Sequence, residues 1–216
     1  MKPAPNKKTP AKKNKTSKQW MNEHVNDPFV QMAQKEGYRS RAAYKLLEID
    51  ARDRLIKPGM VVVDLGAAPG IWSQYITEKL KGRVRIIALD LLEMDALPSV
   101  EFIQGDFRED DVLESLEAAL SDERADLVIS DMAPNISGNR SVDQPRSMYL
   151  AELALDLCER TLKRGGDFVC KLFQGEGSDA FIAAARQRFE RVRVMKPEAS
   201  RSGSREVYLV ARNYRL

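Results

Sequence analysis

Short apolar runs rich in β-branched residues alternate along this chain with longer segments in which apolar residues recur every three or four positions. The short runs have the length and composition of buried strands, and the longer segments have the periodicity of amphipathic helices. The predicted strands begin at Val61 and continue with Val84–Asp90, Val100–Gln104, Ala125–Ser130, Asp167–Phe173, Arg191–Lys196 and Glu206–Ala211. The predicted helices between them are Ile71–Leu80, Asp110–Leu120, Ser147–Leu162 and Asp179–Phe189.

This alternation predicts an α/β fold with a mostly parallel, doubly wound, seven-stranded sheet and helices on both faces. The last two strands are joined by residues 197–205 without a helix, so we expect them to pair antiparallel at the edge of the sheet. The segment that holds Gly138 and Pro145 is predicted to be a loop.

Two further helical segments precede the first strand. One opens at Asp27-Pro28 and breaks at Gly37, and the other covers Arg41–Ile49 with Ser40 as its candidate cap. We expect residues 20–57 to be a helical extension of a single domain that covers residues 20–216. A length of 216 residues and an apolar fraction of 43% are ordinary for one globular domain.

Several classes of protein are disfavoured by composition. No apolar run reaches the length of a membrane span, and the start of the chain lacks the apolar core of a secretory signal, so we expect a cytoplasmic protein without a membrane partner. Two cysteines, Cys158 and Cys170, are too few for a disulfide framework, and His24 is the only histidine. We therefore expect no metal site.

The positive charge of the chain is concentrated at its beginning. Residues 1–19 hold seven lysines and no acid, and removing these seven from the 35 basic residues leaves 28 against 32 acidic ones. We expect residues 1–19 to be a disordered tail. Either it only keeps the protein in solution or it is an arm that makes salt-sensitive contacts with RNA phosphates.

A second group of basic residues surrounds the predicted helix Arg41–Ile49. Arg41 and Lys45 share one face of this helix at a spacing of four residues, while apolar residues occupy another. An exposed helix face would explain the pair, but phosphate binding is favoured by the number of cations within twenty residues. The group consists of Arg39, Arg41, Lys45, Arg52, Arg54 and Lys57.

The segment VVVDLGAAPGIWSQ, residues 61–74, reads as a strand, a tight loop and the start of a helix. Gly66 and Gly70 would let a ligand lie against the main chain of this loop. A dinucleotide fingerprint would need glycine at Ala68 and Ile71, and a P-loop would need a terminal Gly-Lys-Ser/Thr. The loop is therefore predicted to bind a small ligand other than NAD or ATP.

Acidic residues follow three of the predicted strands. Asp90 ends the second strand, twenty residues after Gly70, where an acid can accept hydrogen bonds from ribose hydroxyls. Asp106 and Phe107 follow the third strand and could hold and stack a base, although Phe107 could equally be a core aromatic. Asp131 follows the fourth strand. We expect all three carboxylates at one edge of the sheet.

Lys171 is unusual because it lies in a strand of apolar residues. A buried charge without partners is unfavourable, so such a lysine favours a functional site over a structural ion pair. Burial would favour loss of its proton and a role as general base, whereas nearby acids would favour the charged form. Proton acceptance and mere orientation of the nucleophile both remain open. Three other charged residues form one constellation with it, namely Lys45, Asp131 and Glu206.

Five segments of the chain resemble the FtsJ/RrmJ-type ribosomal RNA 2′-O-methyltransferases, from about Trp20 to the C-terminus. The segments are GAAPGIWSQ, IQGDF, SDMAPNISG, KLFQGEG and SRSGSREVY. The resemblance implies the Rossmann-like fold of S-adenosylmethionine-dependent methyltransferases. Ile71 stands where the family usually has a second glycine.

The resemblance also implies an activity. It is transfer of a methyl group from S-adenosylmethionine to the ribose 2′-hydroxyl of a uridine in the peptidyl-transferase A-loop, aiding ribosome assembly. The substrate would be large-subunit (23S) ribosomal RNA, within the assembled or assembling subunit, and the enzyme a monomer. The implied catalytic residues are Lys45, Asp131, Lys171 as proton acceptor, and Glu206. The implied cofactor contacts are Gly66, Gly70, Trp72, Asp90, Asp106 and Asp131, and the implied RNA contacts are Arg39, Arg41 and Lys45.

Competing interpretations make different demands on the sequence. A base N-methyltransferase would show an Asn/Asp-Pro-Pro-aromatic turn at Asp131, and a cytosine-C5 enzyme would need a cysteine nucleophile. Cys170 should point away from Lys171 into the core, because side chains alternate along a strand. Trp72 could also be a core aromatic. The chain could also be a 2′-O-methyltransferase of another RNA, such as tRNA, or a non-catalytic assembly factor, which would have no need of Lys171.

Overall fold

The computed structural model describes residues 25–121 and 123–215. The predicted tail at residues 1–19 and His24 lie outside the described residues. Among those described, no helix is both long and apolar enough to cross a membrane.

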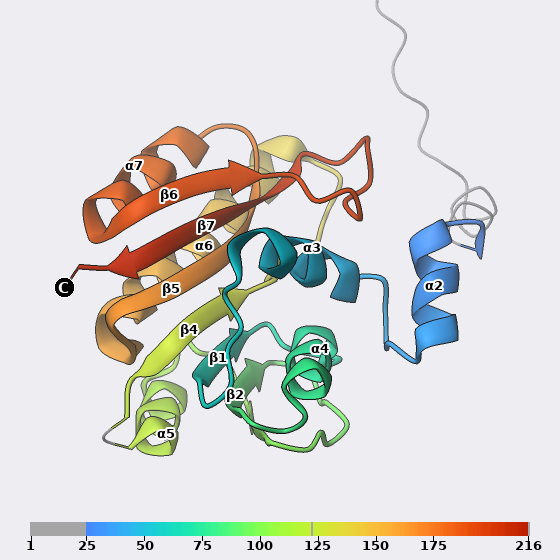
Figure 1. Cartoon of the computed structure of the whole chain (residues 1–216). Coiled ribbons are helices and arrows are strands. Elements are labelled where there is room, and N and C mark those ends of the chain that lie inside the picture. The colour runs from blue at the N-terminus through green and yellow to red at the C-terminus, as the bar shows by residue number, and fades with distance from the viewer. Residues whose placement is uncertain (1–24, 122, 216) are drawn as a thin grey trace, which may run out of the picture.

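Seven strands form one sheet, and helices cover both of its faces (Figure 1). The strands are β1 Val61–Leu65, β2 Arg85–Asp90, β3 Val100–Gln104, β4 Ala125–Ser130, β5 Leu162–Phe173, β6 Phe189–Met195 and β7 Glu206–Tyr214. The helices are α2 Pro28–Glu36, α3 Ala43–Asp53, α4 Ile71–Leu80, α5 Asp110–Leu120, α6 Arg140–Thr161 and α7 Ser178–Arg188. The predicted α/β class is confirmed.

The strand order is β3-β2-β1-β4-β5-β7-β6, and every neighbouring pair is parallel except the two that involve β7. The predicted antiparallel pairing of the last two strands is confirmed. The reversed strand β7 lies between β5 and β6, so β6 forms the edge. The order changes direction between β1 and β4, and ligands bind in such sheets beyond the carboxyl ends of the strands at this point.

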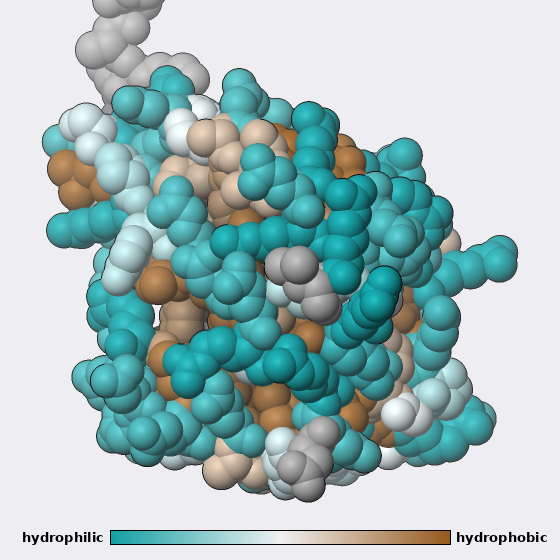
Figure 2. All heavy atoms as spheres, turned by 90° about the vertical axis from the view of Figure 1, so that its left-hand side faces the viewer, coloured by the Kyte–Doolittle hydropathy of each residue, from teal (hydrophilic) through white to brown (hydrophobic). Residues whose placement is uncertain are grey.

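Two apolar layers hold the helices against the sheet. Helices α3 and α4 pack on one face through a cluster that includes Leu46 and Ile76, both fully buried. Helices α5, α6 and α7 pack on the other face, around Leu116 and Phe168. The central strands are apolar on both sides because both faces are covered. Hydrophilic side chains cover most of the side of the molecule on which the parallel strands begin (Figure 2).

The loop predicted around Pro145 is wrong. Helix α6 begins at Arg140 and contains this proline. Asn139 caps its first turn by accepting a hydrogen bond from Ser141 N at 3.2 Å. The carboxylate of Asp143 accepts hydrogen bonds from Ser137 N at 2.9 Å and Gly138 N at 3.0 Å. These contacts fix the preceding turn, so the helix forms despite the amide hydrogen that proline lacks.

Several other boundaries differ from the sequence prediction; for example, β6 begins at Phe189 rather than Arg191, and β7 extends to Tyr214. Helix α3 begins at Ala43 rather than Arg41, because residues 40–43 form a turn in which Ser40 Oγ accepts a hydrogen bond from Ala42 N at 3.1 Å. Strand β5 begins at Leu162, directly after α6, and its pairing with β4 shifts register between Ala125 and Leu127. In contrast, α2 has the predicted Asp27 cap and ends at Gly37 in the left-handed conformation.

Candidate active site

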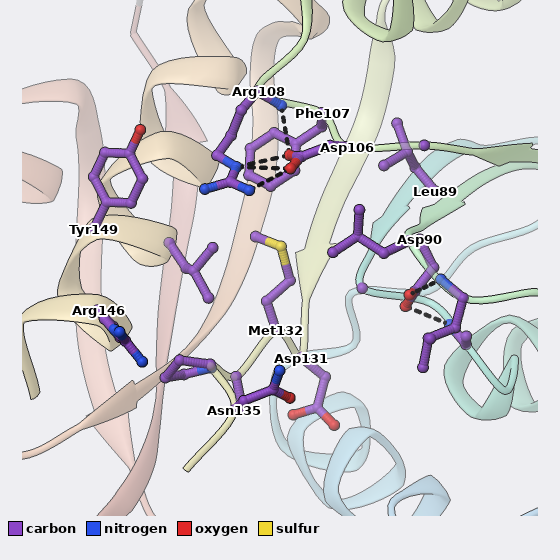
Figure 3. Close-up of a pocket in the computed structure, with 18 residues that line it drawn as sticks. Leu89, Asp90, Asp106, Phe107, Arg108, Asp131, Met132, Asn135, Arg146 and Tyr149 are labelled. Atoms are coloured by element: carbon purple, nitrogen blue, oxygen red, sulfur yellow. Dashed lines mark hydrogen bonds and ion pairs between the residues drawn. The ribbon is translucent and has the colours of Figure 1, made fainter. Parts of the chain in front are cut away.

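A cavity of about 710 Å³ opens at the carboxyl ends of the first four strands (Figure 3). Its wall is formed by the residues that follow these strands and by one side of α6. The lining residues include Gly66, Ala68, Leu89–Leu92, Gly105–Arg108, Asp131–Asn135, Arg146, Tyr149 and Leu150. The predicted edge of the sheet therefore carries the cavity, and Asp90, Asp106 and Asp131 all line it.

The carboxylates of Asp90 and Asp106 are held by hydrogen bonds from residues close to them in the cavity wall. Asp90 accepts from Ala68 N at 2.9 Å and from Leu92 N at 2.8 Å, which ties the end of β2 to the glycine loop. Asp106 accepts from Arg108 Nε at 2.8 and 2.9 Å. The hydrogen bonds from Arg108 hold the pKa of Asp106 below its usual value. Figure 3 shows Asp90 and the Asp106–Arg108 pair on separate parts of the cavity wall.

Gly66 brings the main chain close to the cavity. Its φ is +70°, and a Cβ atom there would lie 2.5 Å from Met132 Cγ. Phe107 is buried in the core and also lines the cavity, so both roles proposed for it are compatible with its position. The volume, the close approach of the main chain at Gly66, and acids after β2 and β3 fit S-adenosylmethionine, which has ribose hydroxyls and a base.

The four residues of the predicted constellation form two ion pairs beside this cavity. Lys171 Nζ lies 3.1 Å from Asp131 Oδ1 and also donates to the main-chain oxygen of Asp131. Lys45 Nζ lies 2.7 Å from Glu206 Oε1. Side chains from α3, β5 and β7 and from the residue after β4 thus lie together, although they are far apart in the sequence.

Tyr208 joins the two pairs. It lies opposite Lys171 in the pairing of β5 with β7, and its hydroxyl donates to Asp131 Oδ1 at 2.6 Å. Lys45 Nζ lies 5.7 Å from the centre of its ring. Sequence reasoning missed Tyr208 as a site residue. The signal was present, because a residue two positions after Glu206 in a strand points to the same side.

The cations of the cluster keep Asp131 ionised. Burial alone would raise the pKa of Asp131, but Lys171, Lys45 and the Tyr208 hydroxyl outweigh it and lower this pKa. Burial and the charge of Asp131 raise the pKa of Tyr208 well above its usual value, so its hydroxyl stays protonated as a donor. Lys171 is only 9% exposed, and its buried charge therefore has the partner that burial requires.

Asp64, in β1, is a further buried acid that sequence reasoning left without a role. It accepts a hydrogen bond from Ser73 Oγ at 2.7 Å. Burial raises the pKa of Asp64 to about 7; the bond from Ser73 opposes this rise, and the charges of Asp131 and Asp90 add to it.

Trp72 and Gly70, two of the predicted cofactor contacts, do not line the cavity. The Trp72 ring is buried 5.7 Å from the Tyr208 ring, and its Nε1 donates to Ala42 O at 3.0 Å. Trp72 therefore packs against the Tyr208 ring of the cluster, as expected of a core aromatic. Gly70 precedes α4, and Ile71 is buried as the first residue of that helix.

The predicted RNA contacts differ in their surroundings. Arg39 donates to the main-chain oxygens of Pro69 and Asp95, the latter at 3.2 Å. Arg41 pairs with Asp27 and donates to Ala199 O, and its side chain is 14% exposed. Lys45 lies in the cluster described above. Cys170 is buried in the cluster of the opposite face, as expected from strand alternation.

The sheet order and the position of the cavity define an α/β fold of the kind found in methyltransferases. The crystal structure of human methyltransferase-like protein 13 in complex with SAH shares the fold, with a TM-score of 0.56 and 15% identity over 75% of each chain. The FtsJ-like methyltransferase family model matches residues 38–214. The chain belongs to the FtsJ-like methyltransferases, as its motifs indicated.

Similar proteins carry more specific names. The chain is 59% identical over 203 residues to ribosomal RNA large subunit methyltransferase E of Pseudomonas fluorescens, covering 94% of this chain and 97% of the relative. The protein of the same name from Legionella pneumophila is 57% identical, with 94% and 98% covered. The crystal structure of a ribosomal RNA methyltransferase from Plasmodium falciparum is 34% identical, with a TM-score of 0.74 over 82% of this chain and 98% of that one.

Proposed function

We propose that this enzyme methylates the ribose 2′-hydroxyl of a uridine in the peptidyl-transferase A-loop of large-subunit ribosomal RNA, and that the modification aids ribosome assembly. The cluster of Lys45, Asp131, Lys171, Glu206 and Tyr208 beside the cofactor cavity is the observation that carries the proposal. The names of relatives above 55% identity support ribosomal RNA as the substrate.

The methyl donor is S-adenosylmethionine, which supplies a methyl group already activated on a sulfonium. Gly66 would bring its main chain against the cofactor, and Asp90 would accept from the ribose hydroxyls. Asp106 and Phe107 would hold the base. Because the methyl group is activated, the residues of the cluster have mainly to align the nucleophile and remove its proton.

Lys171 Nζ is the proposed proton acceptor. Two of its contacts go to the main-chain oxygen and to Oδ1 of Asp131, so Asp131 fixes the direction of the amine. In the ion pair Lys171 is charged, so it would first release a proton to solvent; the resulting neutral amine, still donating to both oxygens of Asp131, would keep one lone pair for the proton of the ribose hydroxyl. The Lys45–Glu206 pair and Tyr208 would balance the charges around Lys171 Nζ and exclude water from it.

The proposed RNA-binding residues lie at the cluster and beside the glycine loop. Lys45 would contact the nucleotide at the cluster, and Arg39 would contact a phosphate beside the glycine loop. Arg41 is also a predicted RNA contact, and its pairing with Asp27 gives it a competing role in holding α2.

The test compares Lys171→Ala with Lys163→Ala, a matched change at a lysine of the same strand whose side chain is 44% exposed. Methyl transfer into ribosomal RNA is measured with labelled S-adenosylmethionine, and cofactor affinity by calorimetry. We expect Lys171→Ala to bind the cofactor normally and to lose roughly 10²- to 10⁴-fold in rate, the usual contribution of a general base. Near-normal turnover would refute the catalytic assignment.

Mapping of ribose methylation tests the substrate. Large subunits from cells without the protein should lack one 2′-O-methyluridine in the A-loop, and the purified protein should restore it. Methylation of tRNA instead would favour a tRNA 2′-O-methyltransferase. Binding without any methylation would favour a non-catalytic assembly factor.

A further inference from the structure

A second cavity, of about 320 Å³, lies on the other side of the segment that follows β4. Residues 131–135 of this segment line the cofactor cavity, and Ile136, the next residue, lines the second one. The remaining lining residues come from α6, from the end of β5 and from the two positions before β7, and are Asp143, Gln144, Phe173, Ser204 and Arg205.

The second cavity adjoins the catalytic cluster. Phe173 lies opposite Glu206 in the pairing of β5 with β7, two positions beyond the pair formed by Lys171 and Tyr208. Lys171 and Phe173 are two residues apart, which is about 7 Å along a strand, and they share a face. Arg205 immediately precedes Glu206. A ribose held at Lys171 therefore has its own base, or the base of an adjoining nucleotide, within reach of this cavity.

The polar side chains of the cavity wall are held in place by hydrogen bonds within the protein. Gln144 Nε2 donates to Phe173 O at 2.9 Å and to Glu176 O at 3.0 Å, while its Oε1 accepts from Arg205 Nη1 at 3.1 Å. Arg205 Nη1 also donates to Gln174 O at 2.8 Å. Within the described part of the chain, both of these bonds use Nη1. The Nε and Nη2 atoms are left as donors for the carbonyl oxygens of a ligand.

The apolar wall offers surfaces for a flat ligand. Phe173 is partly exposed at the end of β5, and Ile136 is 61% exposed at the rim. An exposed isoleucine alone needs no explanation. Here, however, it stands at a cavity that is also lined by a phenylalanine and an arginine, the residue types whose ring and guanidinium stack on unpaired RNA bases.

We propose that the second cavity binds a single unpaired base of the RNA, either that of the methylated nucleotide or that of its neighbour. The inference rests on the proposed function, because it requires an RNA whose ribose lies at Lys171. The volume is at the small end of ligand pockets, which suits one base rather than a larger group.

The first experiment uses Ile136→Ala and Arg205→Gln in the full chain, with Val25→Ala as control because Val25 is an aliphatic residue of similar exposure, 57%, before α2. KM for ribosomal RNA should rise in both site variants, by up to the roughly 5- to 100-fold expected for loss of one whole stacked base. Cofactor affinity and thermal unfolding, measured on each variant, should match wild type for Ile136→Ala. An unchanged KM for RNA in Ile136→Ala would overturn the proposal.

The second experiment identifies the base. Synthetic A-loop RNAs lack the base of the target nucleotide, of its 5′ neighbour or of its 3′ neighbour. One of these removals should raise KM for wild type and have little further effect in Ile136→Ala, because the two changes remove the same contact. Equal fold-changes in wild type and variant for all three RNAs would refute the subsite.

Failure of the proposed methyltransferase function can be distinguished from failure of the base subsite. If the wild-type protein transfers no methyl group to RNA, direct titration with fluorescent A-loop RNA still measures affinity. Weaker binding by Ile136→Ala, but not Val25→Ala, would then support a base subsite in a protein with another activity. Equal affinity of all three proteins would overturn both.

Discussion

Asp64 gives a quantitative prediction because it is a buried acid whose proton is held more tightly in the folded protein than in the unfolded chain. The residue is 1% exposed, and burial raises its pKa from 3.8 to about 7. Ser73 opposes the rise, while Asp131 and Asp90 add to it. The folded protein therefore binds more protons at Asp64 than the unfolded chain does between these two pH values.

The free energy of unfolding falls with rising pH wherever the folded state binds more protons. The stabilising contribution of the protonated Asp64 is complete below pH 3.8 and is lost as pH rises to about 7. Because a tenfold change in proton affinity corresponds to about 1.4 kcal/mol, a pKa of about 7 in place of 3.8 gives a loss of about 4 kcal/mol across this window.

Asp64→Asn should remove this dependence. An asparagine has nearly the same shape, does not titrate, and can still accept the hydrogen bond from Ser73. Other titrating groups are present in both proteins and largely cancel in the difference. We expect the variant to gain stability relative to wild type as pH rises, by up to about 4 kcal/mol between pH 4 and pH 8.

The assay is urea unfolding of wild type and variant at several values of pH from 4 to 8. Ser73→Ala serves as a second variant, since loss of its hydrogen bond should raise the pKa of Asp64 further and extend the window to higher pH. A difference between Asp64→Asn and wild type that stays constant with pH would refute the reasoning.

Local signals predicted most elements of the fold because they were strong and consistent. The helix Ile71–Leu80 and the strand Ala125–Ser130 have the predicted bounds, set by glycines and β-branched runs. Pro145 misled the prediction because the contacts of Asp143 and Gln144, which stabilise the start of α6, come from residues that local patterns do not relate to it.

The sequence indicated which residues belong to the candidate site, but not which of their side chains pair with one another. Resemblance and strand ends pointed to Lys45, Asp131, Lys171 and Glu206. Which of them pair depends on the insertion of β7 between β5 and β6, which sets Tyr208 opposite Lys171 and Glu206 opposite Phe173. No local pattern encodes this insertion. Because Tyr208 is placed by the same insertion, the position of Trp72 in its motif could not show that its ring packs against Tyr208 and not on the cavity wall.

Two further substitutions test the arrangement of the site. Tyr208→Phe removes the 2.6 Å hydrogen bond to Asp131, and we expect a loss of about 1–3 kcal/mol in urea unfolding and a smaller fall in methylation rate than for Lys171→Ala. An unchanged stability would show that the hydroxyl contributes nothing to the cluster. Gly66→Ala places a Cβ 2.5 Å from Met132 Cγ at a φ of +70°. This change should cost about 1–3 kcal/mol of stability and weaken cofactor binding in calorimetry, because Met132 must move into the cavity; normal affinity would contradict the close approach of main chain and ligand.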